Sequence, residues 1–247
     1  MRTRQNRSTQ RLTRQRAVLV ALSYDLMQPL VQIKTSLELM ESSDFARPTV
    51  TQQANTMALS TQTGLQLAEA YRLLLKSDEI LNLPLEAVPV GTILEETAHQ
   101  LSPFAKQFST ELIIDIQGRF APVLTHQPSL ATTLEVLAGS MIQAQAAQVK
   151  RDKYQLVLGA HKTAEGDVAT GVFCQVEGLS DRSLKAARRL VGQARQPMPA
   201  MPPGSISGIL IADMLCAALW QPLRPSAHRS LGGLAVNLPL TSQLQFV

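Results

Sequence analysis

The sequence predicts an α+β protein, in which an N-terminal antiparallel helical hairpin is followed by a C-terminal α/β sandwich. Apolar residues recur at helical spacing in the first third of the chain, and beyond Pro84 the pattern changes to alternating strands and helices. The 45% hydrophobic and 17% charged residues are typical of a globular protein. With 247 residues, two domains are each long enough to bury a core, and we place them at 1–82 and 83–247.

The first predicted helix carries one apolar stripe. Its members lie three or four residues apart and therefore share one helix face: Leu19, Leu22, Leu26, Leu30, Ile33, Leu37 and Met40. Pro29 lies inside the stripe and is expected to kink the helix, because it removes a backbone donor. A second helix is expected over about 51–81. Because a lone hairpin leaves apolar surface exposed, we expect two copies to pair into a four-helix bundle, which makes the protein a homodimer.

The rest of the chain is expected to form a mixed sheet covered on one side by helices. The periodicity predicts helices at 90–107, 129–148, 181–194 and 205–220, and strands at 111–116, 153–160, 171–176 and 232–240. No segment reaches the ~18 apolar residues that a membrane span needs. The apolar run 206–220 is therefore interpreted as a buried core helix.

The positive charge is concentrated at the N-terminus. Residues 1–16 contain six arginines and no acid, which leaves 17 of the 23 basic residues against 19 acidic ones. We interpret this arm as a solvated helix start, with contact to an anionic membrane surface as the open alternative. Nucleic acid is disfavoured as a partner because no aromatic residue interleaves the arginines.

The cysteines and histidines suggest neither a disulfide nor a metal site. Cys174 and Cys216 both lie in apolar runs, which favours buried reduced thiols and a cytoplasmic location. The four histidines lack metal-ligand spacing, so no metal is expected.

Residues 23–30 read Ser-Tyr-Asp-Leu-Met-Gln-Pro-Leu and resemble the phosphoacceptor box of sensor histidine kinases, Ser-His-Glu-Leu-Arg-Thr-Pro-Leu. Later segments follow that family in order. Residues 90–96 look like the start of its ATP-binding domain, and 121–141 are similar to the strand and helix that carry its N box. Residues 204–209 resemble its second glycine box and 232–240 its closing strand. The resemblance implies a C-terminal domain of the histidine-kinase ATPase (Bergerat) type.

The acceptor position departs from the family pattern. It is occupied by Tyr24, whose phenol is protonated at neutral pH and has no base beside it, so it is a poor substitute for an imidazole. Asp25 keeps the acidic character of the family's general-base position. A tyrosine phosphoacceptor is the alternative left open.

The residues that would hold the nucleotide depart as well. The resemblance aligns Ser140 with the family's Mg²⁺-binding Asn, and Gln143 with its Lys. In the first glycine box Gly178 is retained, but the adenine-binding Asp is replaced by Val176, or by Glu177 with the glycine spacing lost. We therefore expect no nucleotide cofactor.

The second glycine box is preserved in part, at Gly204 and Gly208. Tight packing at a turn explains these glycines better than phosphate binding at a helix N-terminus. The glycine-rich lid that precedes this box in the family is replaced by the proline-rich segment 196–204, which favours a stiff extended connection.

These departures predict a pseudokinase adaptor of bacterial two-component signalling, not an enzyme. The expected partner is a response-regulator receiver domain or a partner kinase, which would contact Tyr24, Gln28, Gln32 and Lys34. One alternative is a histidine phosphotransferase, which would need a helix-borne histidine that residues 1–98 do not contain. The other is a kinase that still binds ATP.

Overall fold

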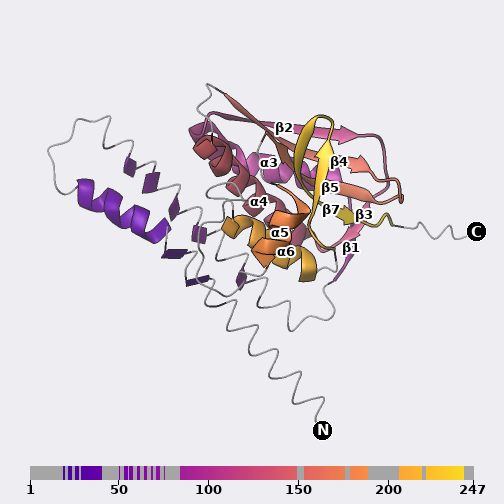
Figure 1. Ribbon diagram of the computed structural model, residues 1–247, viewed down its shortest axis with the longest axis horizontal. Coiled ribbons are helices and arrows are strands. Elements are labelled where there is room, and N and C mark those ends of the chain that lie inside the picture. The colour runs from indigo at the N-terminus through magenta and orange to yellow at the C-terminus, as the bar shows by residue number, and fades with distance from the viewer. Residues whose placement is uncertain are drawn as a thin grey trace, which may run out of the picture.

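Five strands of the C-terminal region form one mixed sheet in the order β2-β4-β5-β7-β6 (Figure 1). They are β2 (Thr110–Gln117), β4 (Tyr154–Lys162), β5 (Val168–Cys174), β6 (Arg224–His228) and β7 (Leu231–Leu238). Strands β2 and β4 run parallel, and the other neighbours pair antiparallel. A separate antiparallel pair joins β1 (Glu86–Val88) to β3 (Val123–Thr125).

The computed structural model describes residues 84–148, 153–175, 179–188, 206–218 and 221–241. In the N-terminal third it describes the helical residues 19, 22–23, 26–27, 29–40, 50, 53–54, 56–57, 60–61, 64–65, 68, 71–72 and 75. The helices of the C-terminal region are α3 (Val90–Gln107), α4 (Gln127–Gln148), α5 (Asp181–Arg188) and α6 (Ile206–Ala218). None of the helices in these ranges has the length and apolar character needed to cross a membrane.

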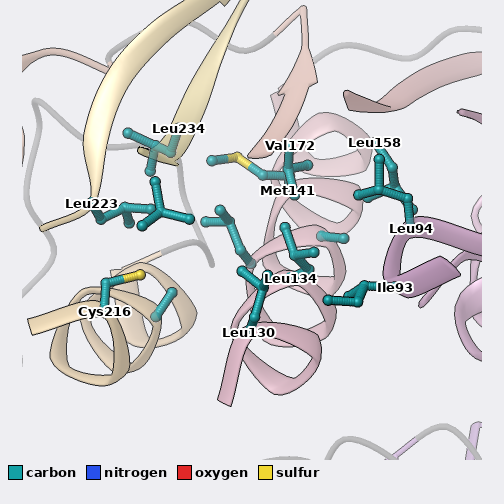
Figure 2. Packing of buried hydrophobic residues seen from close by; sticks show 14 of the residues in the cluster. Ile93, Leu94, Leu130, Leu134, Met141, Leu158, Val172, Cys216, Leu223 and Leu234 are labelled. Carbon is teal, nitrogen blue, oxygen red and sulfur yellow. The ribbon is translucent and has the colours of Figure 1, made fainter. Parts of the chain in front are cut away.

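Side chains of the sheet alternate between its two faces. On β4, Leu156 and Leu158 pack with the helices in the main core, whereas Val157 belongs to a smaller cluster on the opposite face. Figure 2 shows side chains from helices and strands meeting in the main core: Ile93, Leu94, Leu130, Leu134, Met141, Leu158, Val172, Cys216, Leu223 and Leu234. Burial of one such large side chain stabilises the fold by about 1.5–3 kcal/mol.

The hairpin formed by β6 and β7 covers part of the face opposite the helices. Figure 1 shows it in yellow, curving across the sheet. At its tip, Leu231 packs in the smaller cluster with Val157, Phe173 and Ala235. His228, also at the tip, reaches side chains of β4 and β2. The face away from the helices is therefore partly buried too.

Helix α6 is buried on more than one side. Its residues Leu210 and Cys216 belong to the main core, whereas Ile211 and Leu215 belong to a second apolar cluster that includes residues of the N-terminal third. A helix that is hydrophobic all round needs partners on each of its faces. The apolar sequence of this segment is thereby accounted for, and its interpretation as a buried core helix is confirmed.

Helical residues of the N-terminal third contact one another. The ring of Pro29 lies 3.8 Å from the position that a Cβ atom would take on Gly64, and the Ser60 hydroxyl donates a hydrogen bond to Oε1 of Gln32 at 2.9 Å. Side chains 28 or more residues apart thus meet. The hairpin over 1–82, its dimeric bundle and the domain boundary stay predictions.

The α+β class is confirmed, with some corrections to the elements. The strand expected at 171–176 lies at Val168–Cys174, and the described part of the helix expected at 181–194 is Asp181–Arg188. Strand β6 is an addition, because Pro225 inside it reads as a strand breaker. The proline is tolerated since β6 is an edge strand, with one side free of ladder hydrogen bonds.

Candidate functional site

The structure describes five of the residues predicted for the nucleotide and partner sites. Ser140 and Gln143 are half-buried on α4, and Gly208 is buried on α6. Gln32 and Lys34 are exposed on the helical residues 29–40. The other predicted residues lie outside the described residues: Tyr24, Asp25, Gln28, Glu177, Gly178 and Gly204.

Ser140 and Gly208 are brought into direct contact, where α4 and α6 cross. A Cβ atom on Gly208 would lie 1.7 Å from Oγ of Ser140 and 2.9 Å from the backbone oxygen of Val136. Both distances are shorter than a van der Waals contact, so only glycine fits here without a shift of α4. Gly208 lies within α6 and not at the turn that the sequence suggested, and its missing side chain lets the two helices approach.

An apolar cluster packs against the same side of α4. Val136 lies one turn before Ser140 and packs with Ile211 and Leu215 of α6 and with Tyr71, which is fully buried. Partly buried residues complete the cluster: Leu22, Leu26, Leu75 and Met214. Helical residues on both sides of Tyr24 in the sequence therefore pack against α4 and α6.

An ion pair fixes α6 to α5. Nε and Nη2 of Arg188 donate hydrogen bonds to the two carboxylate oxygens of Asp213, at 2.8 and 2.7 Å, and Nη2 also donates to the backbone oxygen of Leu223. The hydrogen bonds that Arg188 donates to Asp213 raise the pKa of its guanidinium. The carboxylate of α6 is thus fully engaged within the protein.

The two cysteines are free and buried, as predicted. Burial raises the pKa of the Cys174 and Cys216 thiols to about 12. Because the thiolate is the reactive form, neither cysteine is a nucleophile at neutral pH.

A second constellation lies on the opposite face of the sheet and was not predicted. The buried ring of His228 is held on both sides: Nε2 lies 2.9 Å from Oδ2 of Asp115, and Nδ1 lies 3.1 Å from Nδ1 of His161. Arg229 makes two further contacts with the Asp115 carboxylate, from Nε at 2.7 Å and from Nη2 at 2.8 Å. The ring of Phe173 stacks on His228, with centroids 4.9 Å apart.

Glycine makes room for the buried ring. A Cβ atom on Gly159 would lie 3.0 Å from Nδ1 of His228 and 3.0 Å from the ring of Phe173. The sequence gives little signal for this constellation, because Asp115, His161 and His228 lie 46 or more residues apart along the chain. His228 lies on strand β6, and the proline in this strand argues against a strand at that place in the sequence.

Burial and the neighbouring groups shift the pKa values of Asp115 and His161. Burial by itself would raise the pKa of Asp115, but the hydrogen bonds from His228 and Arg229 outweigh it and hold that pKa below its usual 3.8. Burial lowers the pKa of His161 below its usual 6.5, and the neighbouring His228 adds to the effect. Within the described ranges, no three His, Cys, Asp or Glu side chains are arranged to bind a metal ion.

No protein-family model and no curated protein matches the chain. Among solved structures it is similar to the Acinetobacter baumannii histidine kinase AdeS, at 12% identity and a TM-score of 0.55, covering 89% of this chain and 98% of that one. It is also similar to full-length ShkA in complex with AMPPNP, at 13% identity and a TM-score of 0.54, covering 93% of this chain and 47% of that one. The chain therefore has a histidine-kinase-like fold.

Proposed function

We propose that this chain is a catalytically inactive, histidine-kinase-like signalling protein, which dimerises and binds a protein partner such as a response-regulator receiver domain. The observation that carries the proposal is the contact between Ser140 and Gly208. In the histidine kinases that the sequence resembles, the N box and the second glycine box both serve the nucleotide. Here their counterparts touch each other.

Two features, the serine at position 140 and its contact with Gly208, disfavour a magnesium nucleotide. Mg²⁺ demands oxygen ligands in octahedral geometry, and a serine hydroxyl at the metal-binding position is a weaker ligand than an amide or carboxylate oxygen. In addition, a triphosphate between α4 and α6 would have to separate helices that are already within van der Waals distance at Gly208. Separating them would also open the cluster around Tyr71, which is fully buried.

Exposed apolar side chains support dimerisation through residues 1–82. Four large ones on the helical residues 27 and 29–37 are between 46% and 62% exposed in the single chain: Met27, Leu30, Val31 and Leu37. Exposed apolar groups that gather on one element mark an interaction surface. A second copy of the same helices would bury them.

The proposed partner surface is the neighbourhood of Tyr24, Gln28, Gln32 and Lys34. Lys34 pairs with Glu38 at 3.5 Å, in an exposed contact of a kind that contributes little to stability. Its ammonium group can therefore change partners at little cost. Lys34→Glu is expected to weaken binding of a cognate receiver domain in calorimetry, whereas Lys162→Glu, an exposed lysine on β4, should not.

The proposed inactivity is tested by incubating the full chain with γ-labelled ATP and Mg²⁺, alongside its Tyr24→His variant. Neither protein should become labelled, because restoring the imidazole does not restore a nucleotide site. Labelling of the variant at residue 24 would mean that the ATP site works. Labelling of the unaltered chain at Tyr24 would show instead a tyrosine-accepting kinase, and either outcome would contradict the proposal.

A dimer is expected by light scattering, at twice the chain mass of 26.9 kDa. Leu30→Asp should give the monomer mass, because a carboxylate in the apolar contact is costly to desolvate. Leu124→Asp, on β3 away from these helices, should leave the dimer intact. A monomeric unaltered chain at tens of micromolar would refute dimerisation.

A further inference from the structure

The carboxylate of Asp115 sets the tautomer of both histidines. It is an acceptor, so Nε2 of His228, 2.9 Å away, must carry a hydrogen and donate it. In neutral His228 the other nitrogen, Nδ1, is then an acceptor. Its partner, Nδ1 of His161 at 3.1 Å, must therefore carry the hydrogen of that contact. The Nε2 atom of His161 is left with its lone pair.

This lone pair faces solvent. Among the residues that the structure describes, none hydrogen-bonds Nε2 of His161, and this atom is not among the buried polar atoms that lack a partner. His161 is half-buried at the end of β4, while His228 behind it is only 2% exposed. A ring with one nitrogen open to water and the other held from inside can react at the open nitrogen.

We propose that His161 is an acceptor site for a phosphoryl group delivered by a small acyl phosphate, with His228 as its general base and Asp115 as the residue that positions that base. The order of the three groups is that of a nucleophile, a base within hydrogen-bond reach and an orienting carboxylate. This site is separate from the α4–α6 contact, and the inference does not depend on the proposed function.

Asp115, His228, His161 and the acyl phosphate account for every bond and proton of the transfer. Nε2 of His161 attacks phosphorus, the N–P bond forms, and the bond from phosphorus to the acyl oxygen breaks. The leaving group departs as a carboxylate and needs no proton. The hydrogen on Nδ1 of His161 moves to Nδ1 of His228, and the resulting imidazolium is stabilised by the Asp115 carboxylate at 2.9 Å. Phospho-His161 then accepts that hydrogen bond in return.

A phosphoryl group suits the site better than an acyl group. Phosphoryl transfer passes through a loose transition state and asks the protein chiefly for positioning and positive charge. The side chain of Arg229, 67% exposed, lies at the hairpin tip beside this relay, and the exposed Lys162 follows His161 in the chain. Acyl transfer would need donors placed for an oxyanion.

The test is to incubate the full-length protein with acetyl phosphate and to follow the phosphorylation of each histidine by mass spectrometry at alkaline pH, with ³¹P NMR to identify the nitrogen. His99, exposed on α3, is the internal reference. His161 is expected to react at Nε2 at least about tenfold faster than His99, since a positioned base contributes at least that much. A smaller ratio would overturn the proposal.

Two variants distinguish a catalytic role of Asp115, His228 and His161 from a purely structural role in holding the β6–β7 hairpin on the sheet. Asp115→Asn keeps the shape but removes the charge, and should lower the His161-to-His99 ratio to below about a tenth of its value. Leu231→Ala loosens the same hairpin tip, because it removes packing in the smaller apolar cluster, but it leaves the polar contacts of His228, and it should change the ratio by less than about threefold. Equal effects of both variants would assign the cluster a structural role only and refute the proposal.

Discussion

The two faces of the five-stranded sheet hold different chemistry. On the side covered by helices, α4 and α6 meet at a glycine and a serine hydroxyl, and a fully buried tyrosine packs against both helices. On the other face, an imidazole that is 2% exposed is held between a carboxylate and a second imidazole. A shared fold thus fixes the scaffold, whereas the polar groups on each face decide what chemistry is available.

On the helix-covered side, the largest expected loss of stability comes from a change at Tyr71. Tyr71→Ala is expected to lower the free energy of unfolding by about 4 kcal/mol, because it removes a fully buried ring from the cluster that joins the N-terminal helices to α4 and α6. Urea unfolding measures the effect. Leu85→Ala, at a side chain that is 51% exposed, is the control and should change stability by less than about 0.5 kcal/mol. A loss below about 1 kcal/mol for Tyr71→Ala would argue against this contact.

The closeness of α4 and α6 predicts a smaller loss at Gly208. Gly208→Ala should cost about 2 kcal/mol, since its Cβ atom would overlap Ser140 and approach the backbone oxygen of Val136. Gly139→Ala is the matched control, because nothing lies within 4 Å of its added Cβ atom. It should stabilise the helix by about 0.5–1 kcal/mol, as alanine is the better helix former. Equal effects of the two changes would contradict the close crossing.

The opposite face predicts a pH dependence, which is the smallest effect. The lowered pKa of Asp115 stabilises the fold above pH 3.8, and that contribution is lost as the pH falls through the lower folded value. The lowered pKa of His161 makes folding less favourable as the pH falls below 6.5. Both groups therefore make stability rise with pH on the acid side.

Urea unfolding between pH 3 and pH 7 checks this sign. Asp115→Asn should flatten the dependence below pH 4, and His161→Gln should flatten it below pH 6.5. Gln117→Ala, an exposed residue on β2 that does not titrate, should leave the slope unchanged. Unchanged slopes in both histidine-cluster variants would show that the cluster does not form in solution.

Local patterns predict the helices of this chain well. The 3.6-residue periodicity predicts a helix at 90–107, and α3 spans Val90–Gln107. The apolar run of α6 likewise predicts a buried helix, although it does not tell which surfaces bury it. The packing of Tyr71 and Leu26 against α6 depends on contacts more than 130 residues apart, for which a single sequence carries no signal.

The candidate sites, too, can be predicted only in part from the sequence. The resemblance to histidine kinases marks Ser140 and Gly208 separately, and the structure adds that they touch. The pairing of His161 with His228 follows from the curvature of the β6–β7 hairpin across the sheet, and this curvature cannot be read from residue spacing. Pro225 further conceals the strand, because an edge strand accepts a proline that a central strand would reject.

Calorimetry with ATP and Mg²⁺ on the full-length chain tests the central claim most directly. The Ser140→Asn/Gln143→Lys double variant, which restores the family's residues, should be titrated beside it. We predict no saturable heat from either protein up to about 1 mM ATP, because α4 and α6 touch at Gly208 and would have to separate to admit a triphosphate between them. Micromolar binding by the unaltered chain would contradict the claim, since α4 and α6 would then have to separate and form a working nucleotide site.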